Sequence, residues 1–151
     1  MIGRKVMVLA DKRDYQRGYK KHYSAYKELC GEVTVVKSRR LLLAYCVECG
    51  LKYLLLDKWH ENNPKKIIED KEDRRNGIIK THNLDKILKE LGQAGTFKFP
   101  QLETKHYDIV ATESFHELCR YGIEVKAGEE AKENKFEEEL LKVAKWIGEE
   151  L

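Results

Sequence analysis

Apolar residues recur along most of the chain at steps of three and four, the spacing of positions on one face of an α-helix. Residues 11–30 show this spacing first. The positions concerned are Tyr15, Tyr19, Tyr23, Tyr26 and Cys30. Lysine and arginine occupy much of the opposite face, so the pattern predicts an amphipathic helix whose tyrosines face a core. Stacking of these tyrosines on nucleic-acid bases is the alternative. Residues 1–10 either extend this helix or form a loose arm.

The most apolar part of the chain lies within residues 35–60. Between residues 41 and 56, apolar side chains occupy almost the whole circumference of a helix, which is typical of a central, buried helix. Glu48 and Lys52 are the two charges in this run, and their spacing of four, with glutamate first, favours an ion pair on one helix face. Gly50 lowers helix propensity by roughly 1 kcal/mol. We therefore expect a neighbouring helix to approach closely at this glycine.

The remainder of the chain is predicted to alternate between loops and amphipathic helices. Helical spacing returns in residues 81–91, 105–123 and 129–150. Residues 61–80 form a highly charged connection with space for one helical turn around Ile67, and residues 93–104 form a second loop. A connection as long as residues 61–80 is unusual inside a compact domain and is often functional.

Each of these three predicted helices has an apolar face. Thr81 or Asn83 can cap the first of them, because a side-chain oxygen there accepts a backbone N–H, and Gly92 ends it. The predicted core positions are Leu84, Ile87, Leu88, Leu91, Ile109, Phe115, Leu118, Cys119, Phe136, Leu140, Val143, Ile147 and Leu151. The pattern as a whole predicts an all-α fold. It is an up-down antiparallel bundle of four to five helices, formed by residues 1–151 as one domain.

Composition adds few restrictions on function. The net charge of +3 permits a basic patch without requiring nucleic-acid binding. The sequence shows no signal peptide and no apolar run of about 18 residues, so we expect a cytoplasmic protein without a membrane span. Its four cysteines are then expected to be free thiols. Cys46 and Cys49 form a CxxC pair inside the apolar helix, without a second ligand pair at zinc-finger spacing, so we interpret them as core residues and expect no metal or cofactor.

Three passages together resemble the HEPN family of nucleotide-binding domains. They are Cys46–Leu56, Thr81–Leu88 and Leu118–Gly122, which look like the family's "glutamate, x, x, leucine-lysine", "threonine-histidine-asparagine-leucine" and "leucine, x, arginine-tyrosine" segments. The resemblance implies a helical bundle that forms a homodimer and handles RNA or nucleotides. Many members are metal-independent endoribonucleases of toxin–antitoxin, abortive-infection or CRISPR systems. Others lack the active-site motif and work beside a nucleotidyltransferase partner or bind nucleotides.

The family's active-site motif is an arginine, a polar residue and, several positions later, a histidine. Arg75, Asn76 and His82 match it, with six positions between the arginine and the histidine. Histidine can move a proton near neutral pH, and the guanidinium fork of arginine suits phosphate, so this set is our candidate catalytic site. The alternative is that His82 packs or caps at the start of the helix and Arg75 lies on the surface.

Further cations are candidates for binding phosphate. They are Arg39, Arg40, Arg74, Lys80 and Arg120. Clustered lysines and arginines bind nucleic acid through release of counterions. Arg120 follows His116 by four positions, so the two share a helix face, but their order is the reverse of the family motif. Arg120 is therefore expected to anchor the bundle or to hold a phosphate. Three functions remain open: an endoribonuclease, a non-catalytic module that binds a nucleotide or a partner, and a structural or regulatory subunit whose exposed helix face mediates assembly.

Overall fold

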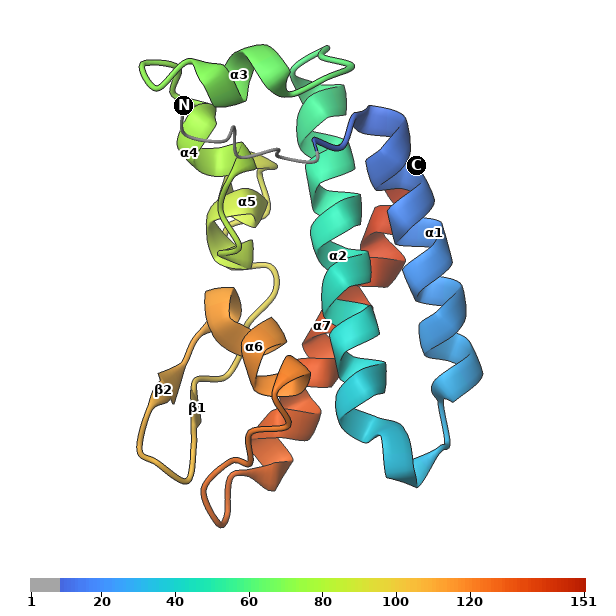
Figure 1. Ribbon diagram of the computed structural model, residues 1–151, viewed down its shortest axis with the longest axis vertical. Coiled ribbons are helices and arrows are strands. Elements are labelled where there is room, and N and C mark those ends of the chain that lie inside the picture. The colour runs from blue at the N-terminus through green and yellow to red at the C-terminus, as the bar shows by residue number, and fades with distance from the viewer. Residues whose placement is uncertain (1–8) are drawn as a thin grey trace, which may run out of the picture.

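The computed structural model describes residues 9–151, and most of the predicted arm at residues 1–10 lies outside the described residues. Three long helices form the body of the molecule (Figure 1). They are α1 (Lys12–Leu29), α2 (Val36–Lys58) and α7 (Glu130–Glu150). The central helix α2 packs against both α1 and α7. The described chain is an all-α bundle, as the sequence predicts.

Short elements cover the side of α2 opposite α1 (Figure 1). The short helices are α3 (Lys65–Glu69), α4 (Asn76–Ile79), α5 (Leu84–Glu90) and α6 (Phe115–Arg120), and two 3-10 turns are η1 (Val33–Val35) and η2 (Thr112–Ser114). A small antiparallel hairpin joins β1 (Leu102–Glu103) to β2 (Ile109–Val110), with Leu102 opposite Val110. Both α5 and α6 contact α2.

Close approach of the three long helices occurs at Gly50. A Cβ atom at this position would lie 2.8 Å from Cγ2 of Ile147 on α7 and 2.8 Å from Cδ2 of Tyr19 on α1. A methyl group does not fit there, which explains why glycine occupies the middle of a buried helix. The Tyr19 hydroxyl donates a 2.7 Å hydrogen bond to the carbonyl of Ala144, so α1 and α7 are also joined directly. The expected close contact at Gly50 is confirmed.

The long helices begin and end near the predicted positions. A capping box starts α1, because Asp11 accepts from the Asp14 backbone N–H and Asp14 accepts from that of Asp11. Asn83 is the cap of α5 and accepts from the Lys86 N–H at 3.1 Å. The turn expected around Ile67 is α3. The short helix α4 was not expected within the loop of residues 61–80.

The helix predicted over residues 105–123 is wrong in its first half. Residues 105–114 complete the hairpin and form η2, and α6 contributes the only helical part of that range. Ile109 was expected in the core but is 56% exposed, whereas its neighbour Val110 is buried. Adjacent side chains of a strand point to opposite faces, which accounts for this difference. Leu151 and Cys30 are also exposed rather than in the core.

Apolar side chains from distant segments meet beneath the short elements. The ring of Phe115 stacks on that of Phe136 with centroids 4.0 Å apart, and Phe99 adds a third ring 4.9 Å from Phe136. These contacts attach α6 and the preceding loop to α7. No helix within residues 9–151 is long and apolar enough to cross a membrane.

Candidate functional site

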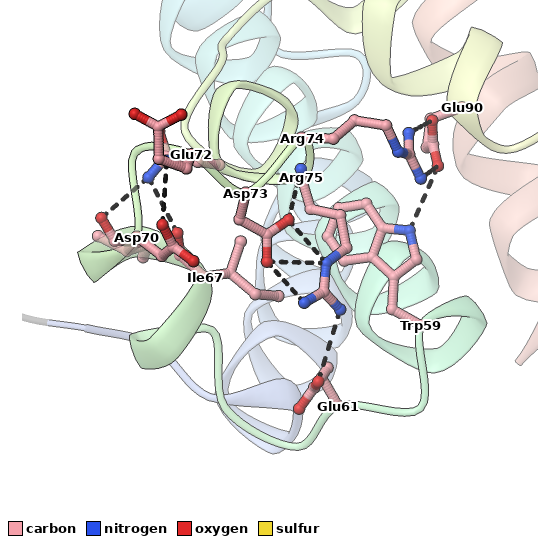
Figure 2. Close-up of polar contacts among 11 residues, drawn as sticks. Trp59, Glu61, Ile67, Asp70, Glu72, Asp73, Arg74, Arg75 and Glu90 are labelled. Atoms are coloured by element: carbon pink, nitrogen blue, oxygen red, sulfur yellow. Dashed lines mark hydrogen bonds and ion pairs between the residues drawn. The ribbon is translucent and has the colours of Figure 1, made fainter.

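Arg75 is held by acidic side chains at the far end of α2 (Figure 2). Its guanidinium donates to Asp73 at 2.7 Å, approaches Glu61 at 3.5 Å, and lies 5.6 Å from the ring centroid of Trp59. Hydrogen bonds from Arg75 lower the pKa of Asp73 to about 2. The positive charge of Arg75 is therefore balanced within the protein.

His82 lies at a different level of the bundle from Arg75. It contacts Glu48 on α2, whereas Arg75 contacts Trp59 just beyond the end of α2. Eleven residues of helix, at 1.5 Å per residue, separate these two α2 positions by about 16 Å. Asn76 is occupied elsewhere, since its amide donates to the carbonyls of Ile67 and Ile68, both at 2.9 Å. Within one chain, the three residues of the predicted motif do not form a common site.

Two of the predicted phosphate-binding arginines are part of the bundle interior. Arg40 is only 6% exposed and donates to Glu133 at 2.6 Å and to Glu137 at 2.7 Å. Arg39 donates two hydrogen bonds to Glu137, at 2.8 and 2.9 Å. These contacts join α2 to α7. Burial raises the pKa of Glu137, but the hydrogen bonds from Arg39 and Arg40 outweigh this effect and the net shift is downward. Both arginines therefore have a structural explanation.

Arg74 and Lys80 are placed on the surface around α4. Arg74 donates to both carboxylate oxygens of Glu90, at 2.9 and 3.1 Å, as Figure 2 shows. Glu90 also accepts a hydrogen bond from the indole of Trp59 at 3.3 Å, so this pair attaches the loop to the end of α2. Lys80 is exposed at the end of α4.

A polar cluster lies where α5 and α6 meet the middle of α2. The Glu48 carboxylate forms an ion pair with Lys52 at 3.2 Å and also contacts Nδ1 of His82. An ionised carboxylate only accepts hydrogen bonds, which assigns the Nδ1 hydrogen of His82 to this contact and leaves Nε2 as its other ring nitrogen. The His82 side chain is 56% exposed, whereas the Glu48 side chain is largely buried. Glu48 therefore orients an imidazole that solvent or a ligand can reach.

A second imidazole lies beside the first. The ring centroids of His82 and His116 are 5.1 Å apart, with the rings tilted by 47°. The His116 side chain is 15% exposed. Its pKa is lowered, first by burial and then by the positive charges of His82 and Arg120, so His116 is neutral at pH 7. The site thus combines an imidazole that contacts a carboxylate with one that is neutral, and imidazole is the side chain suited to proton transfer in this pH range.

Arg120 extends the cluster along α6. It follows His116 by four positions, and its guanidinium donates to the hydroxyl of Tyr45. Tyr45 lies one turn before Glu48 on the same face of α2, because positions three apart are neighbours on a helix. Among the described residues, Arg120 has no carboxylate partner within ion-pair distance. Unlike Arg39, Arg40, Arg74 and Arg75, it therefore retains an unbalanced positive charge next to the two histidines.

The two histidines are brought together by the cap of α5. The Asn83 side chain donates to Glu113 at 2.9 Å and accepts from the Thr112 hydroxyl at 3.3 Å. Thr112 and Glu113 belong to η2, which leads directly into α6 and His116. A small recess lies between the two segments, with an apolar floor that includes Phe115 from α6. One capping residue thus fixes the position of His82 relative to His116.

Sequence reasoning found parts of this cluster but did not join them. His82 was considered with Arg75 or as a cap, Glu48 was noted as the partner of Lys52 and as part of the HEPN-like segment, and His116 was considered only with Arg120. The available signal was in α2, where polar side chains at positions 45, 48 and 52 follow one helical face through an otherwise apolar run. Polar groups inside an apolar helix need partners when they are buried. The partner of Glu48 is His82.

The two cysteines of the CxxC pair lie at the interface of α1 and α2. Cys46 is fully buried, and a Cβ atom at Gly18 would lie 2.9 Å from the Cys49 sulfur. Burial raises the pKa of Cys49 to about 11. Within residues 9–151, no group of three or more histidine, cysteine or acidic side chains is arranged to hold a metal ion.

Comparisons of this chain with protein-family models, with curated proteins and with solved structures find no match. The function proposed below rests on the site around His82 and His116 and on the sequence resemblance described above.

Proposed function

We propose that this protein is a HEPN-like endoribonuclease that cleaves RNA without a metal ion at the His82–His116 site. The observation that carries the proposal is the pair of adjacent imidazoles, one bound to the Glu48 carboxylate and one neutral at pH 7. Two adjacent imidazoles can supply both proton transfers that RNA cleavage needs, one as the base and the other as the acid. In this proposal the protein acts in the cytoplasm, in a system of the toxin–antitoxin or abortive-infection type.

The reaction uses the 2′-hydroxyl of RNA as the nucleophile. His116 is neutral, so it accepts the proton of the 2′-hydroxyl while that oxygen attacks the neighbouring phosphorus. His82 reacts in its imidazolium form: it gives its Nε2 proton to the 5′-oxygen as the phosphorus–oxygen bond breaks, and Glu48 balances the charge of the ring before the transfer. The products are a 2′,3′-cyclic phosphate and a 5′-hydroxyl. Arg120, one helical turn from His116, is the proposed ligand of the phosphate oxygens, where its charge stabilises the additional negative charge of the transition state.

Basic residues on α1 favour a nucleic-acid substrate. Arg13, Lys20 and Lys21 are exposed along this helix. Phosphate backbones bind such residues through counterion release, so affinity for RNA is expected to fall as salt concentration rises. His22 connects α1 to the site, since its ring centroid lies 5.8 Å from that of Tyr45. A strand of RNA at the histidines can therefore continue toward His22 on α1.

The test is cleavage of a labelled single-stranded RNA of random sequence in the presence of EDTA. We expect cyclic-phosphate products from the wild type. His82→Ala and His116→Ala are each expected to slow cleavage by about 10²- to 10⁴-fold, the usual contribution of one general acid or base. His106→Ala is the matched control, because His106 is exposed on the hairpin away from the cluster. Intact RNA after incubation with wild type, or equal rates in all three variants, would refute the proposal.

A non-catalytic module is the second candidate, and the unbalanced charge of Arg120 favours it. A guanidinium beside the Tyr45 hydroxyl can bind a nucleotide phosphate without any proton transfer. In that case nucleoside monophosphates raise the melting temperature of the wild type and not of Arg120→Ala, because a ligand of the folded state stabilises it. RNA remains intact. A nucleotidyltransferase partner belongs to this candidate, and co-purification with such an enzyme would support it.

The HEPN resemblance further suggests a homodimer. Two copies would place two His82–His116 sites on one particle. Light scattering of the purified chain during size-exclusion chromatography measures its mass directly. A mass of twice 17.7 kDa supports the dimer, and a mass of one chain at all concentrations contradicts it.

A further inference from the structure

Two aromatic rings lie near the Arg120 guanidinium. Its central carbon lies 5.9 Å from the ring centroids of both Tyr45 and Tyr121. The ring of His22 follows, 5.8 Å from Tyr45. Side chains from α1, α2 and the end of α6 therefore form one continuous aromatic and cationic surface. This surface begins one helical turn from His116, since Arg120 shares its helix face.

Tyr121 is the exposed member of this surface. It is 66% exposed, although most large apolar side chains of the chain are buried or half-buried. Its backbone is fixed, because its N–H donates to the Glu117 carbonyl at 3.0 Å where α6 ends. The packing of Arg120 against its ring restricts the side chain as well. A tyrosine has only two rotatable side-chain bonds, so little conformational entropy is lost when a ligand covers it.

We infer that Arg120, Tyr45 and Tyr121 form a subsite that binds an unpaired base of single-stranded RNA. Every base has a flat face that stacks on an aromatic ring, and a guanidinium plane adds a cation–π contact. Bases within an RNA duplex have their faces covered, so the surface selects single strands, loops or bulges. This inference rests on the proposed function. It names the substrate class of that site.

The subsite also predicts where the bound strand lies. Cβ atoms at positions 116 and 120 of a helix are about 5–6 Å apart. A base held beside Arg120 therefore belongs to a nucleotide neighbouring the one whose phosphate meets the two histidines. His22 lies further along the same path, beside Tyr45. The strand consequently crosses from α6 over α2 toward His22 on α1.

Binding is measured by fluorescence anisotropy with a single-stranded RNA that carries 2′-O-methyl groups, which remove the nucleophile and prevent cleavage. Tyr121→Ala is expected to lower affinity for this strand by about 5- to 100-fold, the usual effect of losing one stacked base. Tyr121→Phe retains the ring and is expected to stay within about twofold of wild type. Melting curves establish that each variant folds, which the exposure of Tyr121 favours.

Tyr107→Ala is the matched control. Tyr107 is 71% exposed on the hairpin and packs against Lys126, so it offers a second exposed tyrosine beside a cation. We expect its removal to leave affinity unchanged. An equal loss for Tyr107→Ala and Tyr121→Ala, no loss for Tyr121→Ala, or equal wild-type affinity for a duplex of the same sequence each overturns the inference. If Tyr121-dependent binding is found but unmodified RNA stays intact, the base subsite stands and the nuclease proposal fails.

Discussion

Replacing Glu137 with glutamine tests how strongly the buried ionic cluster joins α2 to α7. The carboxylate accepts hydrogen bonds from Arg39, from Arg40 at 2.7 Å and from the Tyr26 hydroxyl at 2.8 Å. Glutamine keeps the shape of the side chain but removes its charge and turns an amide N–H₂ group toward these donors. Arg40 is almost fully buried, so its charge then lacks part of its compensation.

Breaking a buried ion pair by removing one partner costs about 3–5 kcal/mol of folding free energy. Each kcal/mol lowers the melting temperature of a protein of this size by about 2–4 °C, so Glu137→Gln is expected to melt about 6–20 °C below wild type. Calorimetry at pH 7 measures the difference. Glu138→Gln is the matched control, because the neighbouring Glu138 is exposed on the same helix and its replacement should change stability by no more than about 0.5 kcal/mol.

The same variant has a pH signature. The pKa of Glu137 is lowered in the folded protein, so its contribution is complete above the ordinary value of about 4.5 and is lost as pH falls through the lowered folded value. The gap in melting temperature between wild type and Glu137→Gln should therefore be constant near neutral pH and narrow in acid. A gap that does not change with pH, or a Glu137→Gln variant as stable as Glu138→Gln, would refute the charge-based account.

Three further results are expected. Phe136→Ala removes the ring that stacks on Phe115 and should lower stability by about 3–5 kcal/mol in urea unfolding, since a large buried side chain is lost. Asn83→Ala should cost about 1 kcal/mol through loss of the α5 cap, and the NMR signals of the His116 imidazole should shift; an unchanged spectrum would contradict the positioning role of Asn83. Arg120→Ala removes a positive charge near His116. The pKa of His116 in an NMR titration should then rise toward its ordinary value, while burial keeps it below that value. An unchanged or lower pKa of His116 would contradict this account.

The three long helices could be predicted because α1 and α7 repeat their apolar spacing over several turns, and because the apolar run in α2 is too long for a typical strand. Gly50 could be interpreted for the same reason: a glycine inside a buried helix has few explanations besides close packing. The segment at 105–123 lacked such repetition. Ile109 and Phe115 are spaced so that a helix would place them within one broad face, and a two-residue strand is too short to show the alternation of a sheet. The sequence pattern therefore does not predict the short elements, which are held in place by tertiary contacts.

The candidate site could be predicted only in fragments, because its residues meet through the fold. Glu48 and His82 are 34 positions apart, and His82 and His116 are equally far apart. A motif search joins residues that are close in sequence, and it paired His82 with Arg75. The turns between those two residues instead place them at different levels of α2. The contact between His82 and His116 depends on Asn83, whose capping role was expected but whose hydrogen bonds to η2 no local pattern contains.

The balance of charge is the reason that we propose a phosphate site at the cluster around His82 rather than at the other basic residues. Glu48 and Lys52 neutralise each other, and His116 is neutral because it is partly buried. Arg120 adds a positive charge without an ion-pair partner, and the exposed Glu117, which lies 4.0 Å from Nε2 of His116, offsets part of it. A phosphodiester adds one negative charge, which this site balances without exposing a buried acid. To bind Arg40, a phosphate would have to displace the two glutamates that contact this arginine in the interior. The free energy lost by breaking these buried ion pairs exceeds the free energy gained from the new contact.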